Sequence, residues 1–331
     1  MTRAPFAYCL LFFLLIGASG AHAAASAQPA ATNVGEWLAK AAQAVRTSSY
    51  RGVMVHLRKD ELDTMRIIHR YHNNIEQERL ISLTGRPREI LRHGSRVISI
   101  LPENKVVLIT HHEGRDNLLA RVGQFSSEEM QKHYQMRVLD SRRLADRPAR
   151  VISIQPRDKY RYGYRILVDE DTYLPLKLNL IQGDQVLEQL VFTEIAYPDS
   201  IPDEALEAGY DIQDFEVITH GAIQASNPQI ADTEWHSSKL PPGFRLAESG
   251  IRSTESGQLV RQLLFTDGVA TVSAFIAPVD GQEPMNGGTT MGAVNAYGHA
   301  EGDYQITVVG EVPAVTVQMI AEHLEHNGQK P

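Results

Sequence analysis

The stretch YRGVMVHLRKDELDTMRIIHRYH, residues 50–72, indicates the fold of the first two thirds of the chain. Residues 50–58 alternate, with Val53, Val55 and Leu57 on one face, and the pattern continues in the next run beyond Met65. This period of two is typical of a β-strand with one buried face. The sequence therefore predicts two consecutive strands at this point.

Shorter runs of the same kind follow along the chain, separated by turn residues. They lie at 80–83, 97–101, 106–110, 137–139, 151–155, 164–168, 176–180 and 186–195. Successive strands with tight turns predict a meander in a strongly curved antiparallel sheet or open barrel, rather than an α/β fold. The concave face of such a sheet could hold an apolar ligand, or side chains could fill it completely.

Two helices are predicted beside this sheet. Residues 33–46 carry apolar side chains at helical spacing, with Asn33 as the N-cap. Near 126–134, Ser126 is followed three positions later by Glu129, which is the spacing of a capping box. Such a helix could lie over the concave face. The predicted class is therefore a β-rich α+β protein.

A second, smaller domain is predicted toward the C-terminus. The regular pattern weakens after Pro198, and the acidic stretch that follows is typical of a domain end and a linker. Strand-like runs resume at 258–265, 270–276, 289–297 and 304–309. The chain then closes with a helix whose first turn contains Pro313. These elements predict a small α+β domain.

The first 23 residues have the features of a signal peptide. Arg3 is followed by an apolar run, and small residues end in Ala21-His22-Ala23. The run is too short to span a bilayer comfortably, which argues against the alternative of an uncleaved anchor. Cys9, the one cysteine, lies in this segment. We therefore expect a cleaved, exported chain that is held together by burial and has no disulfide.

Charge is unevenly distributed along the chain. The whole sequence has 32 Lys+Arg and 40 Asp+Glu, a net charge of −8, which argues against nucleic acid as a partner. Residues 130–165 contain ten basic side chains and three acidic ones, whereas 194–234 contain ten acidic and no basic side chains. Such blocks either solvate a surface or steer a partner of opposite charge.

The motifs of common enzymes are absent from the sequence. It has no Gly-x-Ser-x-Gly elbow, no His-Glu-x-x-His and no Walker A sequence. His69 and His72 lie three apart in a predicted strand, where they point to opposite faces. His323 and His326 end a predicted helix. The sequence therefore predicts no metal ligands, no cofactor and no catalytic residues, although a pair of carboxylates is not excluded.

The densest candidate binding segment is the run QPRDKYRYGYR, residues 155–165, in which tyrosines alternate with cations. Tyrosine and arginine are common anchors of protein interfaces, and arginine suits phosphates and carboxylates. Alternatively, the tyrosines pack inward and the cations only face water. The candidate ligand- or partner-binding residues are Arg157, Lys159, Tyr160, Arg161, Tyr162 and Arg165.

An ordered set of short motifs runs through both predicted domains. Those of the first domain are Tyr50-Arg51-Gly52, the run 156–165, Val168-Asp169 and Val186-Leu187-Glu188-Gln189. Those of the second domain are Leu240-Pro241-Pro242-Gly243-Phe244, Asp267-Gly268-Val269-Ala270, Ser273-Ala274-Phe275 and Val309-Gly310-Glu311-Val312-Pro313. In this set the chain resembles the RseB/MucB regulators of the envelope-stress sigma factor. The turns at 144–147 and 172–175 depart from the usual family sequences, a Val-Ala-Gly-Arg stretch and a Thr-Gly-Leu turn, which puts the geometry of these two loops in question.

The resemblance implies an architecture. A domain similar to the LolA/LolB lipoprotein carriers, a half-open barrel with covering helices, would occupy 33–215. A linker would follow at 216–233, and the small C-terminal domain at 234–328.

The resemblance also implies a periplasmic negative regulator that is not an enzyme. The small domain would bind the periplasmic part of a membrane anti-sigma factor through Phe244, Phe275 and Glu311 and protect it from proteolysis. Lipopolysaccharide or mislocalised lipoprotein would release the block, and the protein would form homodimers or larger oligomers. The alternatives are a lipid or lipoprotein carrier and, less favoured, a periplasmic hydrolase.

Overall fold

A computed structural model describes residues 33–59, 61–111, 119–219, 234–253, 259–279 and 284–327. The predicted signal peptide lies outside these ranges. Within them, no helix has the length and apolar character needed to cross a membrane.

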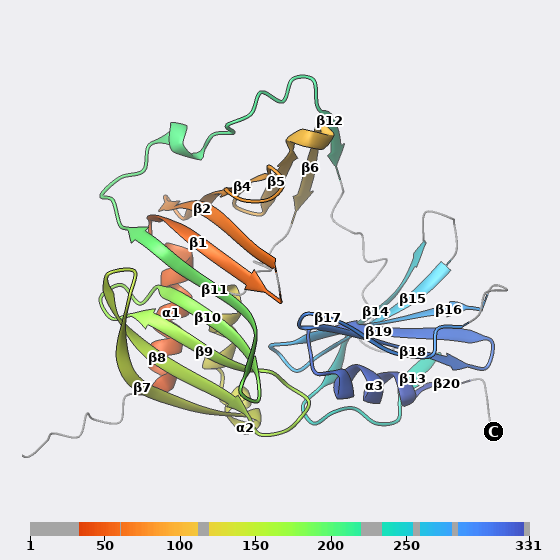
Figure 1. Cartoon of the computed structure of the whole chain (residues 1–331). Helices are drawn as coiled ribbons and strands as arrows, with labels where there is room; N and C mark the ends of the chain where they lie inside the picture. Colours follow the sequence, from red (N-terminus) through yellow and green to blue (C-terminus); the bar gives the residue numbers. More distant parts are fainter. Residues whose placement is uncertain are drawn as a thin grey trace, which may run out of the picture. The chain divides into compact units, whose positions relative to one another are not determined.

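The first domain is built on one sheet of twelve strands (Figure 1). The strands are β1 (Tyr50–Arg58), β2 (Glu61–His72), β3 (Ile75–Ser82), β4 (Glu89–His93), β5 (Arg96–Leu101), β6 (Val106–His111), β7 (Tyr134–Leu144), β8 (Arg147–Pro156), β9 (Gly163–Asp169), β10 (Pro175–Gln182), β11 (Gln185–Ala196) and β12 (Glu216–Thr219). Their order is β12-β6-β5-β4-β3-β2-β1-β11-β10-β9-β8-β7. Because the outermost strands β12 and β7 do not pair, the sheet stays open.

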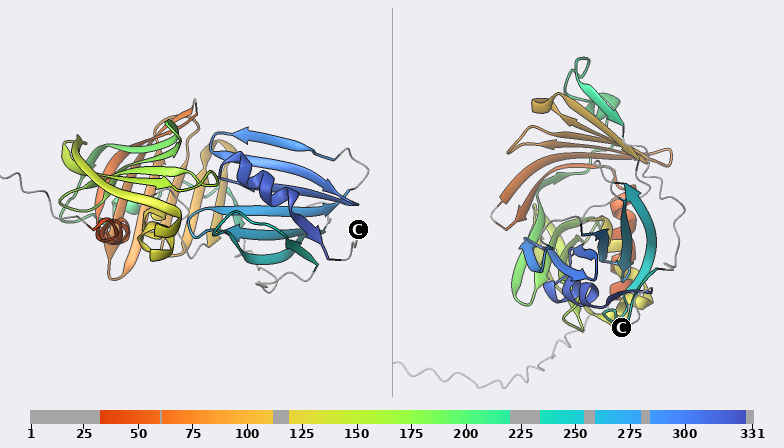
Figure 2. Two further views of the ribbon diagram at one scale, coloured as in Figure 1. Left: turned by 90° about the horizontal axis from the view of Figure 1, so that it is seen from below. Right: turned by 90° about the vertical axis from the view of Figure 1, so that its right-hand side faces the viewer.

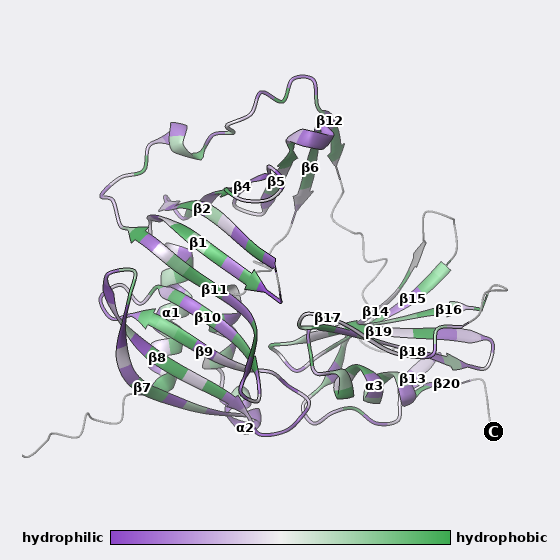
Figure 3. Ribbon diagram, viewed as in Figure 1, coloured by the Kyte–Doolittle hydropathy of each residue, from purple (hydrophilic) through white to green (hydrophobic). Residues whose placement is uncertain are grey.

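The meander predicted from the sequence is confirmed. Neighbouring strands are antiparallel except β12, which runs parallel to β6. Residues 216–219, which the sequence places in the linker, therefore extend the first sheet as β12. The strands carry both apolar and polar residues (Figure 3). In β1 the buried face carries Tyr50 and Met54, whereas the face with Val53, Val55 and Leu57 is half-buried or exposed.

Helices pack on the concave face of the sheet and close the core of the first domain. They are α1 (Val34–Thr47), the 3₁₀ turn η2 (Ala120–Ser126) and α2 (Glu128–His133); two further 3₁₀ turns are η1 (Pro102–Asn104) and η3 (Asp203–Leu206). Leu38 and Val45 of α1 are buried with Phe125 of η2 and with Ile152 and Ile166 of the sheet. Burial of these apolar side chains is the main favourable term that holds the domain together.

One of the two predicted helix starts is confirmed. The Asn33 side chain accepts a hydrogen bond from the backbone N–H of Gly35 at 3.0 Å and caps α1. The capping box predicted at Ser126 is wrong, because that residue ends η2. Ser127 is the N-cap of α2, and its side chain makes no capping hydrogen bond.

The two loops that depart from the usual family sequences, 144–147 and 172–175, both form tight turns. Ala145 and Asp146 have φ of 47° and 65° between the paired residues Leu144 and Arg147, which is a two-residue hairpin turn. Tyr173 has a φ of 60°, a left-handed conformation that usually favours glycine. Its ring packs against Trp37, with the ring centroids 5.2 Å apart, and this contact offsets the backbone strain.

The second domain contains a six-stranded antiparallel sheet, ordered β14-β15-β16-β19-β18-β17, and a short pair β13-β20. Its elements are β13 (Trp235–Ser237), β14 (Arg245–Ser253), β15 (Leu259–Thr266), β16 (Thr271–Pro278), β17 (Gly287–Met291), β18 (Val294–Glu301), β19 (Tyr304–Gly310), α3 (Ala314–Glu322) and β20 (Leu324–His326). Helix α3 lies across one face of the sheet (Figure 2).

The core of the second domain lies between that face and α3. Phe265, Val272 and Ile306 of the sheet are buried with Val317 and Ile320 of α3. The helix predicted to begin near Pro313 is confirmed. The single strand predicted at 289–297 is two strands, because Gly292 adopts a φ of 61° and turns the chain between β17 and β18.

Candidate functional site

The loop between β8 and β9, residues 157–162, carries most of the candidate residues that the sequence predicts. Both sheets belong to one compact unit that begins at Asn33. Within that unit the loop divides its side chains between solvent and the second domain. Arg157 and Lys159 are exposed and Tyr160 is half-buried, whereas Arg161 and Tyr162 are buried; Arg165, on β9, is exposed.

Arg161 is buried against the second domain and is surrounded by oxygen acceptors. Its Nε donates to Asp267 Oδ2 at 2.7 Å, and both side chains are fully buried. The other guanidinium nitrogens donate to the carboxylate of Asp158 and to the backbone carbonyl of Pro242. The guanidinium also lies over the ring of Phe244, 5.3 Å from its centroid. A buried charge in such a network fixes one docking geometry, because few other arrangements satisfy all its donors.

Tyr162 makes a second set of buried polar contacts with the small domain. Its hydroxyl lies 3.0 Å from the carbonyl of Ala293 and 3.1 Å from that of Val312, and accepts from Asn295 Nδ2 at 3.0 Å. Burial raises the pKa of Tyr162 to about 12, although the contact with Asn295 opposes this shift. The hydroxyl therefore stays protonated at neutral pH and remains a donor.

Two further contacts join the domains. Arg121 Nη2 donates to Glu311 Oε2 at 2.6 Å. The hydroxyl of Thr316, at the start of α3, donates to the carbonyl of Tyr160 at 2.8 Å. Together with Arg161 and Tyr162, these residues make the interdomain contact polar as well as buried.

The residues predicted to bind an anti-sigma factor have different surroundings. Phe244 is 6% exposed beside Arg161, and Glu311 is paired with Arg121, so both take part in the contact between the domains. Phe275 is half-buried on β16, on the face opposite to the core residue Ala274. Of the three predicted residues, Phe275 alone projects from the face of the small sheet away from α3.

A cavity of about 590 Å³ lies on the concave face of the large sheet. Its lining includes the apolar side chains of Met65, Leu80, Ile90 and Leu101. Three exposed cations, Arg58, Arg86 and Arg88, also line it. The lining includes two carboxylates as well, Asp63 beside Arg58 and Glu103 beside Arg86. An apolar floor with cations at its rim suits an amphiphile that has acyl chains and anionic head groups. The sequence pattern did not place these residues together, because they lie on different strands and loops.

Ionisable groups also lie on this concave face, next to the cavity and near α1, and they are partly or fully buried. His56 of β1 contacts Glu188 of β11, and His69 of β2 lies beside Glu76 of β3. Burial raises the pKa of Glu78, while the charges of His69 and Arg92 partly oppose the shift. His69 is fully buried and His72 is exposed, which confirms that the two point to opposite faces.

Several residues of the interdomain contact were not predicted from the sequence. Asp267 was noted only within the family motif at 267–270, and Arg121, Asn295 and Thr316 carried no signal. Arg121, Thr316 and Asp267 each contact a residue more than a hundred positions away in the chain. No local pattern of residues reveals such pairs.

An open sheet with a cavity on its concave face, joined by buried polar contacts to a second sheet domain, is the architecture of a two-domain binding protein. The MucB/RseB N-terminal domain model matches residues 33–210, and the MucB/RseB C-terminal domain model matches residues 229–325. The chain belongs to the MucB/RseB family.

Relatives and solved structures of this family resemble the chain over most of its length. The sigma factor AlgU regulatory protein MucB of Pseudomonas aeruginosa is 32% identical over 88% of this chain and 90% of its own. The sigma-E factor regulatory protein RseB of Escherichia coli K12 is 24% identical over 91% of this chain and 92% of its own. The crystal structure of MucB in complex with MucA(peri) has 27% identity and a TM-score of 0.70, and covers 90% of this chain and 100% of that one.

Proposed function

We propose that this protein is a periplasmic negative regulator of a sigma-E-type envelope stress response, and not an enzyme. It acts by binding the periplasmic part of a membrane anti-sigma factor and shielding it from proteolysis. The observation that carries the proposal is the match of both family domains across the chain, together with the MucB relative solved in complex with MucA(peri). The signal-like N-terminal segment supports the periplasmic location.

The binding surface we propose is the face of the small sheet that carries Phe275. The strand partners of Phe275 are Gln262 of β15 and Thr307 of β19, and α3 covers the opposite face of this sheet. An aromatic side chain among small and polar neighbours is a common anchor for a partner chain. Phe244 and Glu311 would influence binding indirectly, through the interdomain contact.

Isothermal titration of the mature full-length protein with the periplasmic segment of its organism's anti-sigma factor tests this function. We expect micromolar or tighter binding. Phe275→Ala should weaken it at least about tenfold, because an interface loses its aromatic anchor. Leu259→Ala, which truncates a 63% exposed apolar side chain of the same domain, is the matched control.

Absence of heat and of complex formation with the unmodified protein would refute the regulatory function. Equal affinities for the Phe275 variant and the control would refute the binding surface while leaving the function standing. Light scattering of the same samples tests the homodimer or larger oligomer that the family resemblance implies.

A second function, the binding of lipopolysaccharide or lipoprotein acyl chains, is favoured by the cavity on the concave face. Such binding would either release the anti-sigma factor or, if the protein is a carrier, be its main activity. The apolar floor would receive acyl chains, and Arg58, Arg86 and Arg88 would contact phosphates. A ligand releases the partner only if it binds the released state more tightly than the complex.

Two matched triple variants locate the anionic head group. Replacing Arg58, Arg86 and Arg88 with alanine should weaken lipopolysaccharide binding at least about tenfold, because each phosphate loses a charge-assisted donor. Replacing Arg157, Lys159 and Arg165 removes the same charge from the exposed part of the run at 155–165.

Arg161 is left out of the second set because it is buried. A greater loss in that set would place the head group at 155–165, the location predicted from the sequence. Unchanged affinity in both sets would refute binding of the phosphates by either cluster.

A further inference from the structure

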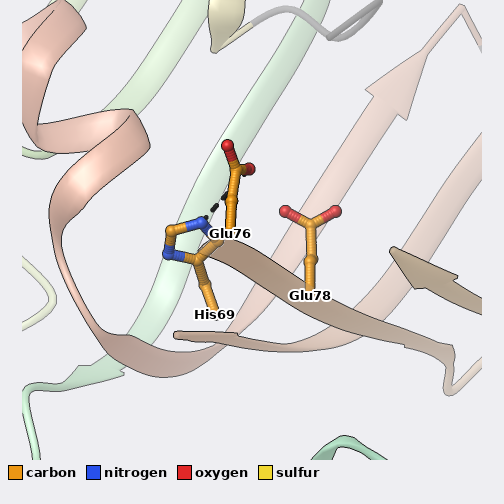
Figure 4. Close-up of side chains that lie close together, drawn as sticks. All are labelled: His69, Glu76 and Glu78. Carbon is orange, nitrogen blue, oxygen red and sulfur yellow. Dashed lines mark ion pairs between the residues drawn. The ribbon is translucent and has the colours of Figure 1, made fainter. Parts of the chain in front are cut away.

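Three side chains on the β2–β3 hairpin bring donor atoms for a metal ion together (Figure 4). His69, Glu76 and Glu78 each place one nitrogen or oxygen within 4.8 Å of the other two. The hairpin sets this arrangement, because Asn73 and Asn74 form a two-residue turn with φ of 51° and 62°. His69 then pairs directly with Glu78, and Glu76 lies two residues away on the same face.

A hydrogen bond to the C-terminal end of α1 fixes the orientation of the His69 ring. Its Nδ1 lies 2.6 Å from the carbonyl oxygen of Ser48, the C-cap residue of α1. A carbonyl oxygen only accepts hydrogen bonds, so Nδ1 carries the proton and the lone pair of a neutral ring is at Nε2. A histidine that ligates a metal is typically held in this way by a backbone carbonyl on its other nitrogen.

This tautomer places two acceptors face to face. Nε2 of His69 is 3.3 Å from Oε1 of Glu76. A lone pair and a carboxylate oxygen at this distance repel each other unless positive charge offsets them, and a metal ion bound to both atoms supplies such charge. In tetrahedral zinc sites, bonds of about 2.0–2.2 Å separate neighbouring ligand atoms by about 3.3–3.5 Å. The His69–Glu76 pair already has this separation.

The surroundings favour a compact divalent cation. His69 is fully buried and stacks on Tyr50, with the ring centroids 4.9 Å apart. Two carboxylates close together and away from water are costly unless positive charge offsets them, and Arg92, opposite Glu78 on β4, provides one such charge. The Glu76 side chain is 20% exposed, so an ion has a path from solvent.

We propose that His69, Glu76 and Glu78 form a site for a divalent transition metal, with Zn²⁺ as the best fit. One imidazole nitrogen and two carboxylate oxygens are zinc ligands, whereas Mg²⁺ and Ca²⁺ require more oxygen ligands than this site offers. Solvent completes the coordination on the side of Glu76. The bound ion links the β2–β3 hairpin to the end of α1 through Ser48 and stabilises that side of the concave face.

Metal binding to the mature full-length protein tests the proposal. The protein is stripped with EDTA, dialysed, and titrated with Zn²⁺ against a chromophoric chelator; Co²⁺ replaces Zn²⁺ for absorption spectra. We expect one Zn²⁺ per chain, a tetrahedral Co²⁺ spectrum and a higher Tm with metal. Glu76→Gln and His69→Gln should each lower the affinity at least about tenfold, because each removes a direct ligand and even the loss of an outer partner costs 10–100-fold.

Two controls separate this site from surface histidines and from another His–Glu pair on the same face of the sheet. Glu188→Gln alters the His56–Glu188 pair, which lies on the same face but has one carboxylate. His72→Ala removes an exposed histidine of the same strand. Both should bind Zn²⁺ like the unmodified protein. Glu76→Gln preserves shape at a partly exposed position, so it remains informative if His69→Gln does not fold.

Two outcomes would overturn the proposal. One is no stoichiometric uptake at micromolar free Zn²⁺, which would mean that a proton on His69 balances Glu76. The other is uptake that survives in Glu76→Gln or falls in His72→Ala, which would place the metal elsewhere.

Discussion

Arg161→Ala is expected to lower the free energy of unfolding by about 3–5 kcal/mol, the usual cost of removing one partner of a buried ion pair. The guanidinium is fully buried and donates to Asp267, Asp158 and the Pro242 carbonyl. Asp267 uses its other oxygen to accept from the backbone N–H groups of Val269 and Ala270. Without the arginine, this carboxylate loses its charged partner, and the two domains lose a fixed point of contact.

The chain has two tryptophans, Trp37 in the first domain and Trp235 in the second, so the loss can be followed in each domain. Variants that keep one tryptophan report denaturant unfolding of that domain by fluorescence. In the unmodified protein the two transitions should coincide, and in Arg161→Ala they should separate. Arg157→Ala, four residues away and exposed, is the control. Coincident transitions with a shift no larger than that of the control would contradict the expected role.

Asp169→Asn is the second substitution with a large expected effect, about 2–4 kcal/mol of unfolding free energy at neutral pH. The Asp169 carboxylate is fully buried and accepts from the guanidinium of Arg147 and from the hydroxyl of Tyr197 at 3.2 Å. It also accepts from the backbone N–H groups of Asp171 and Thr172 at 2.9 and 3.2 Å. An amide has one acceptor oxygen and directs its NH₂ group at donors, so the network is left unsatisfied.

Asp169 also makes the free energy of unfolding depend on pH, in a direction that follows from its pKa. Burial alone would raise the pKa of Asp169, but the hydrogen bonds from Arg147 and the backbone outweigh it and hold the pKa below the ordinary value of 3.8. A carboxyl with a depressed folded-state pKa stabilises the fold above its unfolded pKa. This contribution is lost as pH falls from that value through the lower folded pKa.

Denaturant unfolding at neutral pH and at pH values below about 4 checks both expectations. The difference between the unmodified protein and Asp169→Asn should shrink as the pH falls. Asp171→Asn is the control, because Asp171 contacts the same arginine but has 68% of its side chain exposed. An equal loss in the control would show that Arg147, and not the buried carboxylate, sets the stability of this turn.

Much of the fold could be predicted from sequence because its signals are local. Alternation at 50–72 depends on neighbours two positions apart, and the Asn33 cap depends on a residue two positions away. The predicted cap at Ser126 was wrong because the chain forms the 3₁₀ turn η2 up to that position. Similar sequences can form a 3₁₀ turn or an α-helix. The spacing of a capping box does not say which of the two helices begins there.

The site was predictable only in part. Exposure of Arg157 and Lys159 fits the expectation that cations face water, but nothing local distinguishes them from Arg161, which has the same chemistry and is buried. The difference comes from Asp267, more than a hundred residues away. The donor set around His69 was missed for a related reason, since histidine pairs were sought within one strand and the partners lie on the next.

The position of β12 has a consequence for self-association. An open sheet normally exposes backbone donors and acceptors at each edge, where a strand of another molecule can add and seed aggregates. β12 is itself one of these edges, and with only 4 residues it is a short strand that leaves few backbone groups unpaired. At the other edge, β7 has a bulge between Val138 and Ser141 and carries exposed charges, including Arg137 and Arg142. Part of the basic segment thus hinders the addition of a foreign strand at β7.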